Sequence, residues 1–178
     1  MAAKKKAKHS GAGRSKAGRA RGAPGGSRAR TAKFRTGSTA KPRTAAHDLK
    51  AERARLERNK QLVLAFYQRL IGEKDPVAAR KYMGDTYRQH NPTAADGHAG
   101  VAAWVRSFKQ AFPNHRYEVK KVVAESDLVV LHLHGINGPS PFGESVIDIF
   151  RVENGKVVEH WDVIQPIPET PDNANTMF

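Results

Sequence analysis

The stretch that decides the fold is Asp148-Ile-Phe-Arg-Val-Glu-Asn-Gly-Lys-Val-Val-Glu-His-Trp-Asp162. Its centre, Asn154-Gly155, is a strong signal for a two-residue β-hairpin turn, because both residue types tolerate the positive φ that such turns need. Apolar and polar residues alternate beside the turn, as they do in a strand with one buried face. The stretch therefore predicts two antiparallel strands, over residues 146–152 and 157–164.

The carboxylates at the two ends of this stretch are the first candidate functional groups. If the turn has two residues and the ladder is regular, Asp148 lies opposite Trp161, and Asp162 points to the other face of the sheet. A single β-bulge in either strand would bring Asp162 round to join Asp148. The sequence leaves both arrangements open, and only the second gives a shared site.

Upstream of the hairpin, the periodicity of apolar residues predicts three helices and further strands. The expected helices run from Thr44 or Asp48 to Gly72, over 75–84 with Met83 on the inner face, and over 101–112. A short strand is expected within 86–92, and others over 117–122 and 128–136. Because helices and strands are largely segregated along the chain, the predicted fold class is α+β rather than parallel α/β.

The positive charge lies almost entirely ahead of these elements. Residues 1–47 contain 14 Lys or Arg and no Asp or Glu, whereas residues 61–178 contain 12 basic and 14 acidic residues. Residues 1–45 have too few large apolar side chains to bury a core, so we expect a disordered basic tail, followed by one domain over 46–178.

Three interpretations of the tail, residues 1–45, remain open. A polycation binds nucleic acid weakly and without sequence preference, through the release of counterions. The segment is also rich in Arg and free of acidic residues, as organelle transit peptides are, although it lacks an amphipathic stripe. The third interpretation is a solvated extension without a specific role.

Several classes of protein are excluded or disfavoured by composition. The chain has no cysteine, which excludes disulfides, thiolate metal sites and a Cys nucleophile. It has neither an apolar run long enough to span a membrane nor a secretory signal, so we expect a cytoplasmic protein without membrane contact. Phosphate-binding loops and the Gly-x-Ser-x-Gly elbow of hydrolases are also missing.

Candidate functional residues gather on the hairpin and on the segment Tyr87-Arg-Gln-His-Asn-Pro92. Asp148 interrupts an apolar strand, where a carboxylate is costly unless it is paired or solvated, and it can act as a proton donor or acceptor. The other candidates are Phe150, His160, Trp161 and Asp162 on the hairpin, and Tyr87, His90 and Asn91 beside the loop. His132 and His134 share a strand face, but they lack further ligands at a suitable spacing, so we expect no metal.

The hairpin and the segment 87–92, followed by Asp96-Gly97, resemble the SnoaL-like branch of the nuclear transport factor two superfamily. The ending Gln165-Pro-Ile-Pro-Glu169 and Asn173-Ala-Asn-Thr-Met-Phe178 is similar to bacterial proteins described as predicted SnoaL-like aldol-condensation enzymes. The resemblance covers about residues 56–178. It implies a cone-shaped, curved antiparallel sheet wrapped round three N-terminal helices, with a small-molecule pocket inside, and a homodimer.

The resemblance also implies roles for the two carboxylates. In SnoaL polyketide cyclases, an aspartate at the position matching Asp162 is the general acid/base of an intramolecular aldol closure that needs no cofactor. Those cyclases carry a histidine where this chain has Asp148. Ketosteroid isomerases carry an aspartic acid there, which helps to hold an oxyanion, but their base lies in the region matching His90-Asn91, where this chain has no carboxylate.

Together these observations predict a cofactor-independent enzyme that acts on a carbonyl compound by proton transfer. Asp162, Asp148 and His90 are the expected catalytic residues, and Tyr87, Asn91, His160, Trp161 and Phe150 are expected to bind the substrate. The alternative is a non-catalytic ligand- or protein-binding domain, with the basic tail associating with nucleic acid. A deep apolar cavity lined by both carboxylates would favour the enzyme, and a filled or shallow cone the binding domain.

Overall fold

The predicted hairpin forms and lies inside the sheet. In a computed structural model that describes residues 45–178, strands β4 (Glu144–Glu153) and β5 (Lys156–Pro166) pair antiparallel on either side of Asn154-Gly155. Both turn residues have positive φ, 51° and 70°, as a type I′ turn requires. The predictions for the basic tail, residues 1–45, concern residues 1–44, which lie outside the part of the chain that the structure describes, and Ala45, which is the first residue of a helix.

A β-bulge sets the register of this hairpin. The pairing skips Val158, so that Arg151 lies opposite Glu159 and Asp148 lies opposite Asp162. An extra residue in one strand turns the side chains that follow it to the opposite face from the one a regular ladder would give. Of the two arrangements that the sequence left open, the bulged one is therefore the one that forms, and the two carboxylates share a face of the sheet.

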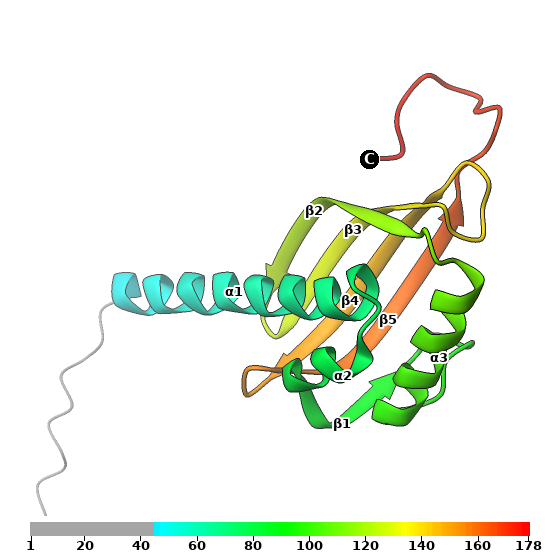
Figure 1. Cartoon of the computed structure of the whole chain (residues 1–178). Helices are drawn as coiled ribbons and strands as arrows, with labels where there is room; N and C mark the ends of the chain where they lie inside the picture. Colours follow the sequence, from blue (N-terminus) through cyan, green and yellow to red (C-terminus); the bar gives the residue numbers. More distant parts are fainter. Residues whose placement is uncertain (1–44) are drawn as a thin grey trace, which may run out of the picture. The chain divides into compact units, whose positions relative to one another are not determined.

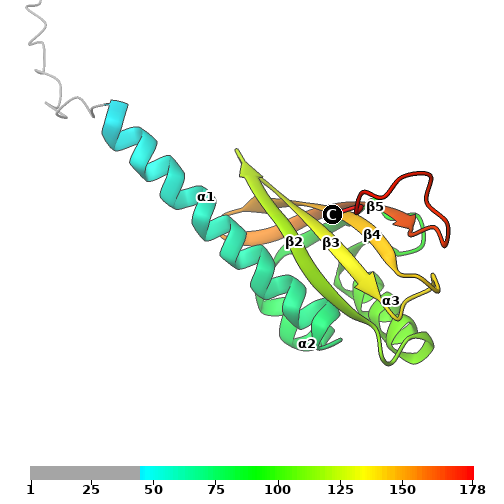
Figure 2. The same cartoon turned by 90° about the horizontal axis from the view of Figure 1, so that it is seen from above.

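Three helices lie against one face of the sheet (Figure 1). They are α1 (Ala45–Tyr67), which continues into a π-helical turn at Gln68–Gly72, α2 (Pro76–Ala79), which continues into a 3-10 turn at Arg80–Tyr82, and α3 (Gly97–Ala111). The first half of α1 projects beyond the sheet (Figure 2), and its buried residues begin only at Asn59.

The second helix ends earlier than the sequence predicted. Met83 has extended backbone angles and is the first residue of strand β1 (Met83–Gln89), not part of the helix. Its side chain is nonetheless buried in the core. An apolar residue that points inward fits a short helix or a strand equally well, so the pattern alone misplaced the boundary.

The sheet is mixed rather than wholly antiparallel. Strands β2 (Arg116–Glu125) and β3 (Leu128–Ile136) complete the order β1-β5-β4-β3-β2, in which β1 runs parallel to β5 and all other pairs are antiparallel. The parallel pair arises because β1 and β5 are joined through α3 and three strands, so no tight turn forces them to run antiparallel. The α+β class and the position of the helices on one face are as predicted.

The core is built where α1 meets the sheet. Phe66 has no exposed surface, and its ring lies edge-to-face on Phe150 of β4 at 5.7 Å and tilted against Tyr87 of β1 at 6.4 Å. Aromatic pairs of this kind stabilise a core beyond the burial of their area alone. Phe66 therefore joins α1 to two strands that lie far apart in the sequence, β1 and β4.

We expect Phe66→Ala to lower the free energy of unfolding by about 3–5 kcal/mol, because it opens a cavity among three packed aromatic rings. Urea unfolding followed by circular dichroism measures the loss. Leu49→Ala is the matched control, since Leu49 is 72% exposed on the projecting half of α1, and its effect should stay within about 0.5 kcal/mol. Equal losses in the two variants would contradict this account of the core.

Candidate functional site

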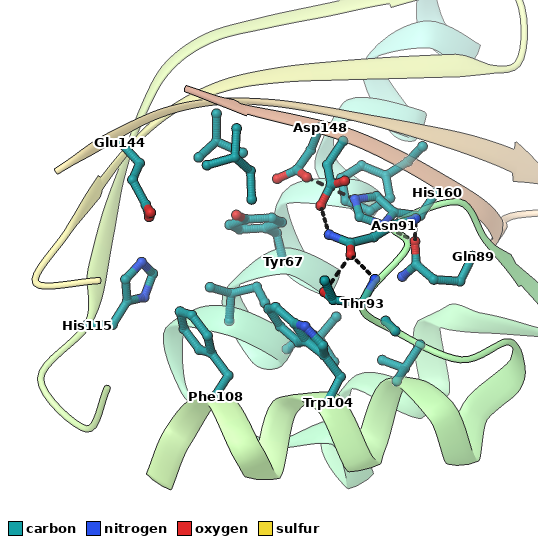
Figure 3. A pocket seen from close by; sticks show the side chains of 18 of the residues that line it. Tyr67, Gln89, Asn91, Thr93, Trp104, Phe108, His115, Glu144, Asp148 and His160 are labelled. Carbon is teal, nitrogen blue, oxygen red and sulfur yellow. Dashed lines mark hydrogen bonds and ion pairs between the residues drawn. The ribbon is translucent and has the colours of Figure 1, made fainter. Parts of the chain in front are cut away.

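A cavity of about 270 Å³ lies between the sheet and α3 (Figure 3). This volume is near the lower end of small-molecule sites, which span roughly 300–1,000 Å³. The cavity is lined mostly by apolar and aromatic side chains, which include Tyr67, Ile71, Val101, Trp104, Phe108 and Val146. Polar residues stand at two ends, Asp148 and His160 at one and His115 and Glu144 at the other (Figure 3).

Asp148 and His160 form a buried pair that holds one proton more than a carboxylate and a neutral imidazole would carry. The Gln89 Oε1 atom accepts the backbone N–H of Asn91 at 2.9 Å, which fixes it as an oxygen, so His160 Nδ1, also 2.9 Å away, must donate to it. His160 Nε2 lies 2.8 Å from Asp148 Oδ1. With Nδ1 already protonated, that contact needs a second proton, either on Nε2 or on the carboxyl group.

The shared proton keeps this pair neutral overall, whichever of the two groups carries it. This matters because Asp148 is only 4% exposed and its Oδ2 atom has no hydrogen-bond partner within residues 45–178. A lone carboxylate at such a depth would be costly, whereas a paired one is tolerated. The pair is thus a buried source of one proton at the polar end of the cavity.

Asp162 is held in the opposite role, as an acceptor. Asn91 Oδ1 accepts the backbone N–H of Thr93 at 2.8 Å, and this orients the amide so that its Nδ2–H donates to Asp162 Oδ2 at 2.5 Å. Asp162 makes no other side-chain hydrogen bond within residues 45–178. One oxygen of Asp162 is therefore anchored, and the other remains available to a ligand.

Two phenols complete this end of the site. Burial raises the pKa of Tyr67 well above its usual range, and the neighbouring Asp148 carboxylate raises the pKa further. Burial, followed by the charges of Asp148 and Asp162, likewise raises the pKa of Tyr87. Both hydroxyl groups stay protonated near neutral pH and can serve as hydrogen-bond donors to a ligand.

The far end of the cavity carries His115 and Glu144, and the sequence signalled only one of them. Glu144 follows the same two-residue period as Val146, Asp148 and Phe150, which places it on the cavity face of β4. That period could have identified it. His115 lies in a turn before β2, where no periodicity applies, and only the structure reveals its position.

Most, but not all, of the predicted site residues line the cavity. Tyr87, Asn91, Asp148, Phe150, His160 and Asp162 do so. His90 and Trp161 do not, because strand alternation turns Trp161 away from its neighbours His160 and Asp162. The His90 ring stacks on Trp161 at 4.6 Å, and its Nε2 contacts Glu159 at 2.9 Å. His90 and Trp161 therefore lie outside the lining of this cavity, and a contact of either residue with the substrate stays a prediction.

Among residues 45–178, one set of groups could hold a metal ion. Ligand atoms of Asp148, His160 and Asp162 all lie within 4.8 Å of one another. An ion there would have to replace the proton between Asp148 and His160, since the hydrogen bond with Gln89 already protonates the other imidazole nitrogen. That no metal is needed stays a prediction. His132 contacts Ser145 Oγ at 3.0 Å, and neither His132 nor His134 lines this cavity.

Comparisons with known proteins point to one family. The family model of the SnoaL-like polyketide cyclases matches residues 61–169. Among solved structures, TsrD from Streptomyces laurentii matches with a TM-score of 0.52 and 24% identity, over 61% of this chain and 88% of its own. An NTF-2 like protein of unknown function from Burkholderia xenovorans matches with a TM-score of 0.51 and 19% identity, over 65% of this chain and 89% of its own.

These structural likenesses support the fold and leave the chemistry open, since identities below a quarter indicate shared architecture and fold does not determine function. Among curated proteins, none matches the chain. Within residues 45–178, no helix is long and apolar enough to cross a membrane.

We expect Nδ1 of His160 to carry a proton at pH 7, because it donates to Gln89 Oε1. Long-range ¹⁵N–¹H correlation spectra of the imidazole report the protonation of each ring nitrogen. Gln89→Leu removes the acceptor and should change the Nδ1 signal of His160 while the His47 signals, from an exposed ring on α1, stay unchanged. An unprotonated Nδ1 in the unaltered protein would contradict the proton assignment.

We expect the imidazole of His115 to make the protein less stable in mild acid. Burial, followed by the charge of Lys74, lowers the pKa of His115 from 6.5 to about 4. Between these values the unfolded chain binds a proton that the folded protein does not, so the free energy of unfolding falls as the pH drops, by at most about 3 kcal/mol. Urea unfolding at pH 7.5, 6 and 4.5 should show a smaller loss for His115→Gln; parallel losses would refute the assignment.

Proposed function

Because the chain belongs to the SnoaL-like polyketide cyclase family, we propose that it is a cofactor-independent enzyme that transfers protons on a carbonyl compound. The observation that carries the proposal is the juxtaposition of a proton acceptor and a proton source. Asp162 has one anchored and one available oxygen, and the Asp148–His160 pair holds a proton beside it. Two neighbouring groups whose surroundings keep one protonated and the other deprotonated are the usual components of acid–base catalysis.

The first step removes a proton from the carbon next to the carbonyl group. The available oxygen of Asp162 takes that proton, the electron pair of the C–H bond forms the C=C bond of an enolate, and the carbonyl oxygen gains negative charge. The Tyr67 or Tyr87 hydroxyl donates a hydrogen bond to this oxygen, and the Asp148–His160 pair adds its proton once the hydrogen bond between His160 Nε2 and Asp148 Oδ1 opens. Preorganised donors of this kind are a major source of rate enhancement in enzymes.

The second step uses the enolate and returns the proton. In a cyclase-like reaction, the enolate carbon attacks a second carbonyl carbon of the same molecule, a C–C bond forms, and the new alkoxide takes the proton from Asp162. In an isomerase-like reaction, Asp162 returns the proton to a different carbon. Neither reaction needs a co-reactant, because the proton and the electron pair stay within the substrate and the site.

The cavity favours an enzyme over a non-catalytic binding domain. It is an apolar space whose polar end contains both carboxylates, the arrangement that separates the two hypotheses. Apolar walls strengthen electrostatic interactions inside the site, since they keep water and its screening away.

We also propose a homodimer, formed through the outer face of the sheet. Val163, 69% exposed, and Trp161 lie on this face, away from the cavity. Apolar side chains on a sheet face that no helix covers are the kind of surface that a second copy buries.

We expect Asp162→Asn to slow proton exchange at least a hundredfold, since an amide cannot accept the proton and general-base groups contribute about 10²–10⁴ in rate. The measurement is the exchange of the protons next to the carbonyl of 1-tetralone in D₂O, followed by NMR. Asp172→Asn, at an exposed position of the C-terminal segment, is the control and should exchange at the unaltered rate. Full activity of a folded Asp162→Asn variant would reject the proposal.

A further inference from the structure

The end of the cavity opposite Asp148 has features of a built binding site that the proton-transfer chemistry does not use. His115 is 8% exposed and Glu144 is 7% exposed, yet both line the cavity. Within residues 45–178, the His115 side chain makes no hydrogen bond, and Glu144 makes no ion pair. Burying two polar side chains with so few partners is costly unless something else satisfies them.

Glu144 has one oxygen in use and one free. Its Oε1 accepts the Ser140 hydroxyl at 3.1 Å. Its Oε2 lies close to two glycines: a Cβ placed on Gly138 would be 2.9 Å from it, and a Cβ on Gly135 would be 3.4 Å away. A larger residue at Gly138 would make the flexible end of the Glu144 side chain shift, whereas a Cβ on Gly135 would meet it at ordinary van der Waals distance.

The imidazole of His115 faces the same small space. The Cβ position on Gly135 that lies 3.4 Å from Glu144 Oε2 lies 3.5 Å from His115 Nε2. Two groups therefore converge on one region at this end of the cavity, as Figure 3 also shows. The backbone of His115 is fixed there, because its N–H donates to the Phe112 carbonyl at 3.1 Å and its carbonyl accepts from Lys74 Nζ at 2.8 Å.

The protonation of His115 follows from its surroundings. Burial lowers its pKa to about 4, so the ring is neutral at pH 7 and carries one proton. Nδ1 is closed off and has no hydrogen-bond partner in the described part of the chain, which makes it a poor place for an N–H group. The proton is better placed on Nε2, which faces the side of the ring near Glu144.

We propose that His115 and Glu144 bind a hydroxyl group of the ligand at the far end from its reacting carbonyl. A hydroxyl both accepts and donates, so it can take the Nε2–H of His115 and give its own proton to Glu144 Oε2. A carbonyl could use only His115, and a cation would face the N–H of His115. The ligand class is thus an apolar, ring-containing molecule with a carbonyl at one end and an alcohol or phenol at the other.

This inference rests on the proposed function only to say which end of the ligand reacts. Its test measures binding alone. The probes are 9-fluorenone, its four monohydroxy isomers and the four corresponding methoxy derivatives. None has a proton on the carbon next to the carbonyl, so affinity is measured without turnover. Dissociation constants come from quenching of Trp104 fluorescence, because Trp104 lines the cavity, and are checked by titration calorimetry.

We expect at least one hydroxy isomer to bind about tenfold more tightly than 9-fluorenone, as a hydrogen bond to a charged group can provide. Its methoxy counterpart, which cannot donate to Glu144, should lose this advantage. In Glu144→Gln and in His115→Leu, the preference for the hydroxy isomer should fall below about threefold, while the affinity for 9-fluorenone stays within about twofold. Glu125→Gln, at an exposed position of β2, is the control and should keep the full preference.

Equal affinities for 9-fluorenone and all four hydroxy isomers in the unaltered protein would overturn the inference, and this comparison needs no variant. An unchanged hydroxyl preference in folded Glu144→Gln and His115→Leu would overturn it too. The preference is independent of catalysis, so it should persist in Asp162→Asn. The two measurements therefore separate the two proposals. A hydroxyl preference without proton exchange would contradict the proposed function alone, and proton exchange without the preference would contradict this inference alone.

Discussion

The register of the β4–β5 hairpin is the constraint on which the rest of the site depends. Strand side chains alternate between the two faces of a sheet, so one extra residue decides which face each of them reaches. With Val158 skipped, Asp148, His160 and Asp162 all reach the cavity, and Trp161 does not. The neutral pair of Asp148 and His160 follows from that irregularity, and so does the position of Asp162 within reach of Asn91.

The fold was largely predictable, because its signals are local. Asn154-Gly155 identifies the turn, and the periods of the apolar residues identify helices and strands. Two features were not predictable in the same way. The pairing of β1 with β5 joins segments far apart in the chain, and the boundary at Met83 depends on backbone angles that an inward-facing apolar residue does not reveal.

The site was predictable only in part, and the reasons are geometric. The residue types of Asp148, Asp162, His160 and Asn91 drew attention to them, and they do line the cavity. The sequence allowed a bulge but could not decide whether it forms, because no residue type marks its position. His90 lies outside the cavity lining, since a residue at the end of a strand can face either way. Gln89 and His115 acquire their importance from contacts with distant segments, which no local pattern encodes.

The residue that follows Asn91 has a consequence for the durability of the protein. An asparagine side chain usually deamidates when the backbone nitrogen of the next residue attacks it, which would turn the donor facing Asp162 into a second carboxylate. The next residue here is Pro92, whose nitrogen carries no hydrogen and is closed in a ring. The amide that anchors the acceptor oxygen is thereby shielded from the commonest route of chemical ageing, and the charge of the site is preserved over the lifetime of the molecule.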